Sequence, residues 1–326
     1  MEKIKYNLQL FADLNTNTTL SAGLSDEMKT YYSDYLIDNA QPELVHDQFA
    51  QKHPIPKNGG KNIEFRKFVP FDKATKTLTE GVTPVGGTLS VTKVEATVDQ
   101  YGFYVTLSDI LQLTAIDNTL VETTKLLGSQ AGMTLDTVTR EVLAGGTNVI
   151  YAGGKEARAA LDASSKLTVD DIYRAARFLK AQNAPKIEGS YVAIIHPDVA
   201  YDLMRNEEWI ESHKYAATTE LFEGEIGKIA GVRFVETTEA KIFADAGKES
   251  RDVYATLVLG ANAYGVTEIE GGGLQHIVKQ LGSGGTSDPL NQRATAGWKA
   301  IKTAERLVEN YMTRIESCST FESGAN

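Results

Sequence analysis

The sequence predicts an α+β protein, on three observations. Residues 117–143 have the apolar spacing of one long amphipathic helix, and residues 63–98 have the alternation of a long β-hairpin. Residues 165–290 then alternate short apolar strands with amphipathic helices, which is typical of a compact α/β unit.

Composition sets the broad class of the protein. The chain has 326 residues, enough for two or three compact units, and 42% of them are hydrophobic. The mean hydropathy is −0.25, and no apolar run reaches the ~18–20 residues of a membrane span, so we expect no membrane contact. The apolar patch within residues 1–12 is too short and polar for an export signal, and the single Cys318 excludes an intramolecular disulfide.

Charge narrows the functional classes. The formal net charge of −10 argues against a dedicated nucleic-acid binder, which would show a clustered basic face. Arg174, Arg177 and Lys180 stand at helical spacing and leave weak contact with nucleic acid open, but a solvated helix face is the favoured interpretation.

The N-terminal part predicts an arm followed by a hairpin. Residues 1–25 are polar and aperiodic, Ser25 caps an expected helix over 28–36, and Pro42 separates it from a short turn at 45–49. Residues 63–68 and 91–98 alternate as strands around a turn-rich stretch, and residues 101–107 read as another strand. A two-stranded hairpin cannot fold alone, so we expect it to lie on its own core or on a neighbouring subunit.

The long helix is predicted to be held by packing. It is rich in threonine, which lowers helix propensity. Asp117 is the expected N-cap, and Gly145 and Gly146 are expected to stop the helix with a positive φ. The shared apolar face is expected to contain Ile116, Leu120, Leu127, Ala131, Leu135, Val138 and Val142. A short helix capped by Ser108 is expected to precede it.

The α/β unit has recognisable helix starts. Thr168 is the expected cap of a helix over 172–181, and residues 191–195 are a buried strand followed by a helix after His196 and Pro197. Further strands are expected within 224–235 and at 253–259, 274–279, 298–307 and 311–315.

No short catalytic signature is present in the sequence. The glycine clusters lack the spacing of a phosphate-binding loop, and the five histidines never stand at metal-ligand spacing. His196 has no accompanying nucleophile motif, so a structural hydrogen bond to a turn is the favoured role. We therefore predict no enzyme, no catalytic residue, no metal site and no cofactor.

Four ordered stretches carry a family resemblance: residues 78–84 (LTEGVTP), 196–203 (HPDVAYDL), 227–237 (GKIAGVRFVET) and 288–299, which begins DPLNQR and ends GWK. In this order and spacing the chain resembles the N4-type family of tailed-phage major capsid proteins. Residues 7–12 (NLQLFA) are also similar to the start of coat proteins from phages of Gram-positive hosts.

The resemblance implies the HK97-type capsid fold. Residues 1–53 would be the N-terminal arm, residues 54–104 the extended loop with its β-hairpin, and residues 105–165 a peripheral domain with the long spine helix. Residues 166–293 would form the α/β axial domain, and residues 294–326 would complete the peripheral domain.

The implied function is structural. Copies would self-assemble as hexamers and pentamers into an icosahedral head shell enclosing double-stranded DNA, which they contact non-specifically. A separate scaffold protein and a portal are implied partners, with a decoration protein as an optional one, and assembly is expected in the host cytoplasm before the protein joins the virion. The candidate inter-subunit contacts are Glu80, Gly81 and Pro84 in the loop, together with Arg293 and Trp298.

Two alternatives remain open from the sequence. The first is an encapsulin-like compartment shell with the same fold, and the second is a small-molecule enzyme built on the α/β unit. A deep pocket with convergent polar groups would favour the enzyme.

Overall fold

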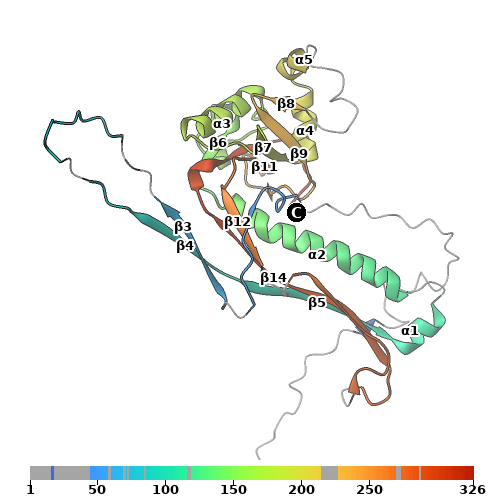
Figure 1. Ribbon diagram of the computed structural model, residues 1–326. Helices are drawn as coiled ribbons and strands as arrows, with labels where there is room; N and C mark the ends of the chain where they lie inside the picture. The colour runs from blue at the N-terminus through green and yellow to red at the C-terminus, as the bar shows by residue number, and fades with distance from the viewer. Residues whose placement is uncertain are drawn as a thin grey trace, which may run out of the picture. The chain divides into compact units, whose positions relative to one another are not determined.

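The computed structural model describes residues 16–17, 45–57, 60–68, 71, 73–83, 86–115, 119–213, 227–268, 273–285 and 288–326 (Figure 1). The predicted helix over 28–36 and most of the predicted arm lie outside these residues. The chain divides into two compact units, which are described separately. One contains Met1–Gln41, Gln100–Thr134 and Gly272–Ile301, and the other contains Pro42–Asp99, Leu135–Gly271 and Lys302–Asn326.

The first unit is built on two long strands. β5 (Asp99–Ser108) neighbours the first part of β14 (Arg293–Arg306), and β13 (Gln275–Lys279) pairs antiparallel with β14. The two-residue strand β1 (Thr16–Asn17) pairs parallel with the end of β5. A Cβ atom added at Gly297 would lie 2.7 Å from the Cβ of Tyr104, and one at Gly102 would lie 2.8 Å from the carbonyl oxygen of Trp298. These glycines therefore allow the two strands to approach closely.

Two helices follow β5. α1 (Asp109–Thr114) is capped as predicted, because Ser108 Oγ accepts a hydrogen bond from the Leu111 amide at 3.2 Å. α2 (Thr119–Ala144) is the predicted long helix, and its first part, to Thr134, belongs to this unit. The predicted cap Asp117 lies outside the described residues.

The buried face of α2 differs from the predicted one in its C-terminal half. Leu127, Ala131 and Leu135 are buried as expected, but Val138 and Val142 are only half-buried. The buried positions there include three polar side chains, which belong to Asp136, Thr139 and Arg140. Val142 packs against the hydrophobic core that contains Leu143, so the departure from the prediction is the burial of these polar side chains, which apolar periodicity cannot detect.

The helix α2 ends where it was predicted to end, but the predicted reason, a glycine with positive φ, was wrong. Neither Gly145 nor Gly146 is among the residues with positive φ. The last carbonyl groups are bound by arginines instead: Arg306 Nη1 donates to Val142 O at 2.7 Å, and Arg314 Nη1 donates to Ala144 O. Gly145 leaves space for this arrangement, since an added Cβ would lie 2.8 Å from Arg306 Nη1.

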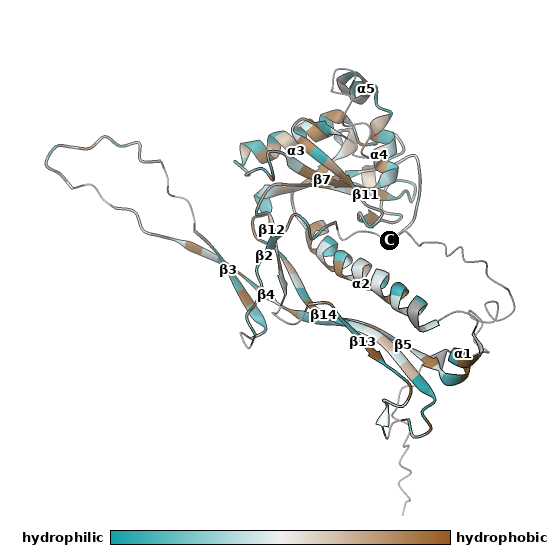
Figure 2. Cartoon of the chain, turned by 45° about the vertical axis from the view of Figure 1, so that its right-hand side comes forward, coloured by the Kyte–Doolittle hydropathy of each residue, from teal (hydrophilic) through white to brown (hydrophobic). Residues whose placement is uncertain are grey.

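The second unit contains a mixed sheet that forms its main core. The strand order is β6 (Val149–Tyr151), β15 (Met312–Ser317), β11 (Val253–Leu259), β7 (Tyr191–Ile195), β9 (Val232–Glu236) and β8 (Lys228–Ile229), and β10 (Ile242–Phe243) pairs with β11. Every residue of β7, β11 and β15 is buried, and β7 and β11 are coloured largely hydrophobic in Figure 2. The predicted strands at 191–195, 253–259 and 311–315 are confirmed.

Helices α3 (Val169–Ala181), α4 (Pro197–Met204) and α5 (Glu207–His213) also belong to this unit. Thr168 and Asp171 form a reciprocal capping box at the start of α3, which confirms the predicted cap. α3 and α4 contribute Ile172, Leu179 and Leu203 to the core that contains β7. His196 caps α4: its Nδ1 accepts from the Asp198 amide at 3.2 Å, so the predicted structural role is confirmed.

Several short elements were not predicted. β12 (Tyr264–Glu268) pairs with the last part of β14 and with β2 (Gln51–Lys52), and β6 was also missed. The single strand expected within 224–235 is a two-stranded hairpin, whose turn residues Ala230 and Gly231 have φ of 55° and 84°. Within the described residues, the unit also has short 3₁₀ turns at Ala152–Gly154, Arg158–Ala160 and Glu309–Tyr311.

The predicted hairpin is confirmed as a separate two-stranded sheet. β3 (Asn62–Phe68) and β4 (Val91–Thr97) pair antiparallel from Asn62↔Thr97 to Phe68↔Val91. Neither strand pairs with the two larger sheets. Among the helices in the described ranges, none is long and apolar enough to cross a membrane.

Candidate assembly interface

The polar face of the hairpin carries a ladder of charges. In the register, Glu64 lies opposite Glu95 and Arg66 lies opposite Lys93, so like charges face each other across the strands. Neighbouring pairs offset this repulsion: Arg66 Nε donates to Glu64 at 2.6 Å, and Lys93 Nζ donates to Glu95 at 2.6 Å. The Arg66 hydrogen bond lowers the pKa of Glu64, and the Glu95 hydrogen bond raises the pKa of Lys93. Each charged side chain of this face therefore has a partner of opposite charge. Charged side chains on a small exposed sheet also discourage its strands from pairing with those of other molecules.

The segment that joins the two strands exposes large apolar side chains. Phe71, Leu78, Val82 and Leu89 are 64%, 78%, 63% and 71% exposed. In a monomer these side chains would remain in water, and a segment that exposes several large apolar side chains is typical of a surface that meets another molecule. We call residues 71–89 the hairpin tip.

Two of the predicted contact residues lie at a turn in this tip. The Val82 amide donates to Thr79 O at 3.2 Å, which closes a β-turn with Glu80 and Gly81 at its centre. Gly81 has a φ of 76°, which the third position of a type II turn requires. Both Glu80 and Gly81 are exposed. The third predicted residue, Pro84, lies outside the described residues.

A groove lies at the base of the same hairpin, with a volume of about 540 Å³. Its floor is apolar and half-buried, and it is made by Ile63, Phe65, Val94, Leu307, Val308 and Tyr311. Its rim is polar and exposed, and it is made by Gln51, His53, Glu64, Arg66 and Asn262. The His53 and Phe65 rings meet edge to face with centroids 5.7 Å apart, which fixes one wall. We call this the basal groove.

Trp298 and Arg293, the other predicted contact residues, both lie in β14 and have partners within the first unit. Trp298 is 5% exposed, and its Nε1 donates to Gln130 Oε1 at 3.0 Å. The Arg293 amide donates to Asp288 Oδ2 at 2.8 Å, and its guanidinium lies 3.8 Å from the same carboxylate. Both residues belong to the first unit, whereas the hairpin tip belongs to the second, and their role between subunits stays a prediction.

The residues that precede the hairpin are fixed by a buried polar cluster that the sequence analysis missed. His46 Nδ1 lies 2.6 Å from Asp136 Oδ2, and the His46 amide donates to Asp136 Oδ1 at 2.9 Å. Asp47 accepts from Thr139 Oγ1 at 2.6 Å and from Lys302 Nζ at 2.5 Å. We call these five residues the base cluster.

Tyr264 of β12 closes the base cluster. Its hydroxyl donates to the carbonyl oxygen of His46, and burial raises the pKa of Tyr264 far above its usual range. Tyr264 is therefore a neutral donor, and it ties β12 to the turn from which the hairpin starts.

A second buried cluster lies at the end of α2. Glu316 is fully buried and accepts two hydrogen bonds from Arg158, both at 2.7 Å, and one from Arg314 at 2.7 Å. The Arg158 guanidinium also lies 3.5 Å from the centre of the Phe243 ring. Two arginines therefore neutralise one buried carboxylate, and Arg314 also binds the end of α2.

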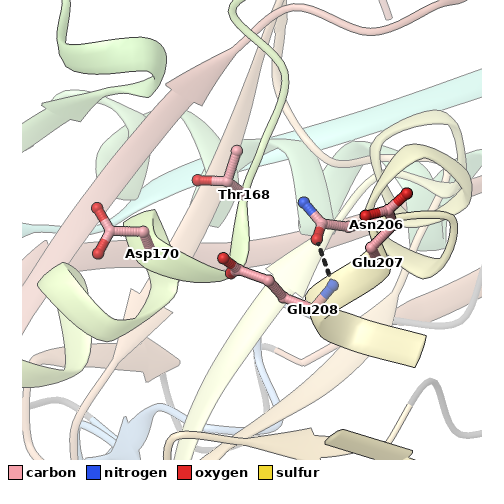
Figure 3. A pocket seen from close by; sticks show the side chains of 5 residues that line it. All are labelled: Thr168, Asp170, Asn206, Glu207 and Glu208. Atoms are coloured by element: carbon pink, nitrogen blue, oxygen red, sulfur yellow. Dashed lines mark hydrogen bonds between the residues drawn. The ribbon is translucent and has the colours of Figure 1, made fainter. Parts of the chain in front are cut away.

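A second hollow, of about 460 Å³, lies in the α/β part of the chain between the starts of α3 and α5 (Figure 3). It is lined by Thr168, Asp170, Asn206, Glu207 and Glu208, all of them polar. Ligand sites are usually lined mainly by apolar and aromatic groups, so this hollow does not have the character of a substrate pocket. Within the described residues, no group of three or more His, Cys, Asp or Glu side chains could hold a metal ion.

The fold itself is that of known capsid proteins. The capsid protein of cyanophage P-SCSP1u is similar with a TM-score of 0.68 and 15% identity over 89% of this chain and 93% of that chain. The capsid of Ralstonia phage GP4 is similar with a TM-score of 0.69 and 16% identity over 95% and 100%. The capsid of cyanophage Pam1 is similar with a TM-score of 0.68 and 13% identity over 99% and 100%. These likenesses confirm the predicted HK97-type fold.

The family follows from the sequence itself. The sequence profile of a phage capsid protein family matches residues 45–281, well over half of the chain. The chain belongs to this family of phage capsid proteins, and it is a structural component of the virion shell. Curated protein sequences give no significant match. The family assignment decides for a phage shell over the encapsulin-like alternative, while membership in the N4-type group stays a prediction.

Proposed function

We propose that copies of this chain assemble as hexamers and pentamers into an icosahedral head shell that encloses double-stranded DNA. The observation that carries the proposal is the hairpin tip, where four large apolar side chains are more than 60% exposed in the segment that joins the two strands of a separate sheet. A two-stranded sheet is marginally stable in water, so burial against another copy would stabilise it.

The remaining partners follow the family resemblance. A separate scaffold protein and a portal would act during assembly in the host cytoplasm, and a decoration protein is optional. The net charge of −10 fits a shell that contacts its packaged DNA only weakly and without sequence preference. The division into arm (1–53), extended loop (54–104), peripheral domain (105–165 and 294–326) and axial domain (166–293) belongs to the same proposal, and so does a function without catalysis.

The test is assembly of the purified chain, followed by negative-stain electron microscopy and by light scattering at several concentrations. We expect shells, tubes or rings of five and six. Replacing both Leu78 and Val82 by serine should raise the assembly concentration at least about tenfold, since each apolar side chain contributes roughly 1.5–3 kcal/mol on full burial.

The matched control is Tyr173→Ser, which removes a 53% exposed side chain on α3 and should leave assembly unchanged. Circular dichroism of both variants checks that the fold is intact. Unchanged assembly of the Leu78/Val82 variant would show that the hairpin tip is not an interface. A monomer at every concentration with a protease-resistant segment 54–104 would contradict the assembly proposal itself.

A further inference from the structure

Residues 319–326, which we call the C-terminal segment, lie on the surface of the second unit. None of these eight residues belongs to a helix or a strand, and residues 320–326 are exposed apart from the half-buried Gly324. Phe321 is the one large apolar side chain of the segment, and it is 44% exposed. The segment therefore buries little apolar surface, and hydrogen bonds must hold it in place.

Three carboxylates accept hydrogen bonds from the C-terminal segment: Asp198 and Asp202 on α4, and Asp252 just before β11. Asp202 Oδ2 accepts from the Thr320 amide at 2.7 Å, and Asp252 Oδ2 accepts from the Gly324 amide at 2.8 Å. Hydrogen bonds to charged acceptors are among the strong ones, so the segment is attached at separate points along its length.

Asn326 connects the C-terminal segment to α2. Its Nδ2 donates to Thr238 O at 2.9 Å and to Ala240 O at 2.7 Å, and its Oδ1 accepts from the Ile242 amide at 3.3 Å. Its main-chain oxygen accepts from Arg140 Nη2 at 3.1 Å. Residue 326 is therefore bound both to the loop before β10 and to the C-terminal half of α2.

Arg140 has few alternatives to this bond. The residue is 2% exposed, Nη1 donates to Glu239 O at 3.0 Å, and Nη2 also donates to Glu141 Oε1 at 2.9 Å. Its Nε has no hydrogen-bond partner among the described residues. A buried guanidinium that loses a partner is destabilised, so its position depends on the bonds at Nη1 and Nη2. Arg140 follows Thr139 directly and Asp136 by one helical turn, and both belong to the base cluster.

We infer that the C-terminal segment is a detachable latch on α2. While it is bound, it holds the Arg140 guanidinium in place and restrains the C-terminal half of the helix. When it detaches, this half loosens, and the base cluster transmits the change to the turn at 45–49 from which the hairpin starts. The bonds of Arg306 and Arg314 to the last carbonyls remain, so α2 loosens without unfolding. The latch acts within one chain and goes beyond the proposed shell function.

Hydrogen exchange of the unassembled full chain, followed by mass spectrometry at neutral pH, tests the latch. Asn326→Ala removes the three side-chain bonds that hold residue 326 on the loop. Exchange of the amides at 136–144 should then become roughly threefold to tenfold faster, as expected for the loss of about one net hydrogen bond. Asp202→Asn, which weakens the attachment at the other end of the segment, should act in the same direction.

The matched control is Glu322→Ala in the same segment. The Glu322 side chain pairs with Arg251 at 3.0 Å, and the two side chains are 53% and 31% exposed, so its loss should leave exchange in α2 unchanged. The coupling must also act in reverse. Arg140→Met should therefore make residues 319–326 more sensitive to limited proteolysis, and circular dichroism checks that each variant remains folded.

A chain that lacks residues 320–326 removes the latch whatever the effect of the point variants. Unchanged exchange at 136–144 in this chain overturns the inference, and so does an increase that is spread evenly over the whole chain or that is equal in Glu322→Ala. Faster exchange in α2 with residues 45–49 unchanged overturns the link to the base cluster. Light scattering reads assembly separately, so failure of the latch leaves the proposed shell function standing.

Discussion

Lys302 of β14 and Asp47, separated by 255 residues in sequence, form an ion pair in which Lys302 Nζ lies 2.5 Å from Asp47 Oδ2. The Lys302 side chain is 2% exposed, and its second hydrogen bond is to Leu135 O at 2.8 Å. This pair fixes the turn that precedes the hairpin, so the position of the hairpin base depends on a buried charge.

Removing the carboxylate should therefore be costly. Asp47→Ala leaves the ammonium group of Lys302 buried without a countercharge, and we expect a loss of about 3–5 kcal/mol in the free energy of unfolding. Urea denaturation of the unassembled chain measures this loss. The double variant Asp47→Leu/Lys302→Met should be more stable than Asp47→Ala, because it removes both charges.

The control is Lys93→Ala in the exposed ladder of the hairpin, where the side chains of Lys93 and Glu95 are 59% and 58% exposed. Exposed pairs contribute little, so the midpoint of unfolding should not change. Equal effects of Lys93→Ala and Asp47→Ala would show that burial of the Asp47–Lys302 pair has no energetic consequence.

Arg314 supports the end of α2 through the buried carboxylate of Glu316. Arg314→Met removes the bond to Glu316 Oε1, at 2.7 Å, and the bonds to the carbonyls of Ala144 and Gly146. We expect a loss of about 3–5 kcal/mol, since a buried charge loses one of its two partners. Hydrogen exchange should increase most in the last turn of α2.

Arg251→Ala is the matched control for Arg314, because Arg251 pairs with Glu322 at 3.0 Å with side chains 31% and 53% exposed. A stability change of Arg314→Met no larger than that of the control would contradict the capping role of Arg314. Exchange that increases evenly along the chain, rather than at the last turn of α2, would contradict it as well.

These two clusters also show where sequence reasoning stops. Local signals sufficed for the hairpin, for the Ser108 and Thr168 caps and for the buried strand at 191–195, because each depends on neighbouring residues. Asp136 and Arg140 stand between apolar positions of the helix and carry no local signal of burial, yet they are 1% and 2% exposed. The partners that bury them are remote in sequence: Asp136 binds His46, 90 residues away, and Arg140 donates to the carbonyl oxygen of Glu239, 99 residues away.

Only the local part of the candidate interface could be predicted from the sequence, again because distant segments give no shared signal. A turn at Glu80 and Gly81 is local and visible in the sequence, whereas the basal groove combines β3, β4 and residues 307–311. No periodic pattern joins those segments. The end of α2 was missed in the same way, because the arginines that bind its carbonyls come from β14 and β15.

The attachment of the C-terminal segment should depend on pH through Asp202. Burial alone would raise the pKa of this carboxyl, but hydrogen bonds from Thr320, Ser319 and Lys166 outweigh burial and lower it. The unfolded carboxyl titrates near about 3.9. A lowered folded pKa means that this stabilisation is fully present above pH ~4 and is lost as the pH falls below it.

Limited proteolysis of residues 319–326 between pH 6 and pH 3 checks the expected release. Asp202→Asn should make the segment accessible already at pH 6 and should flatten its pH dependence. A pH profile that is the same in the wild-type and Asp202→Asn chains would assign the transition to another carboxyl group.

Mutation can show whether Trp298 stabilises its own chain or contacts a neighbouring subunit. Its Nε1 donates to Gln130 Oε1 at 3.0 Å within one unit, and the residue is 5% exposed. Trp298→Phe should therefore cost about 1 kcal/mol in the unassembled chain, and Trp298→Ala about 3–5 kcal/mol. Gln130→Ala combined with Trp298→Phe should cost less than the sum of the two changes, because both remove the same hydrogen bond.

Trp209, which is also 5% exposed, remains as the fluorescent reporter of unfolding. A Trp298→Ala chain with normal stability but impaired assembly would instead place the Trp298 side chain between subunits.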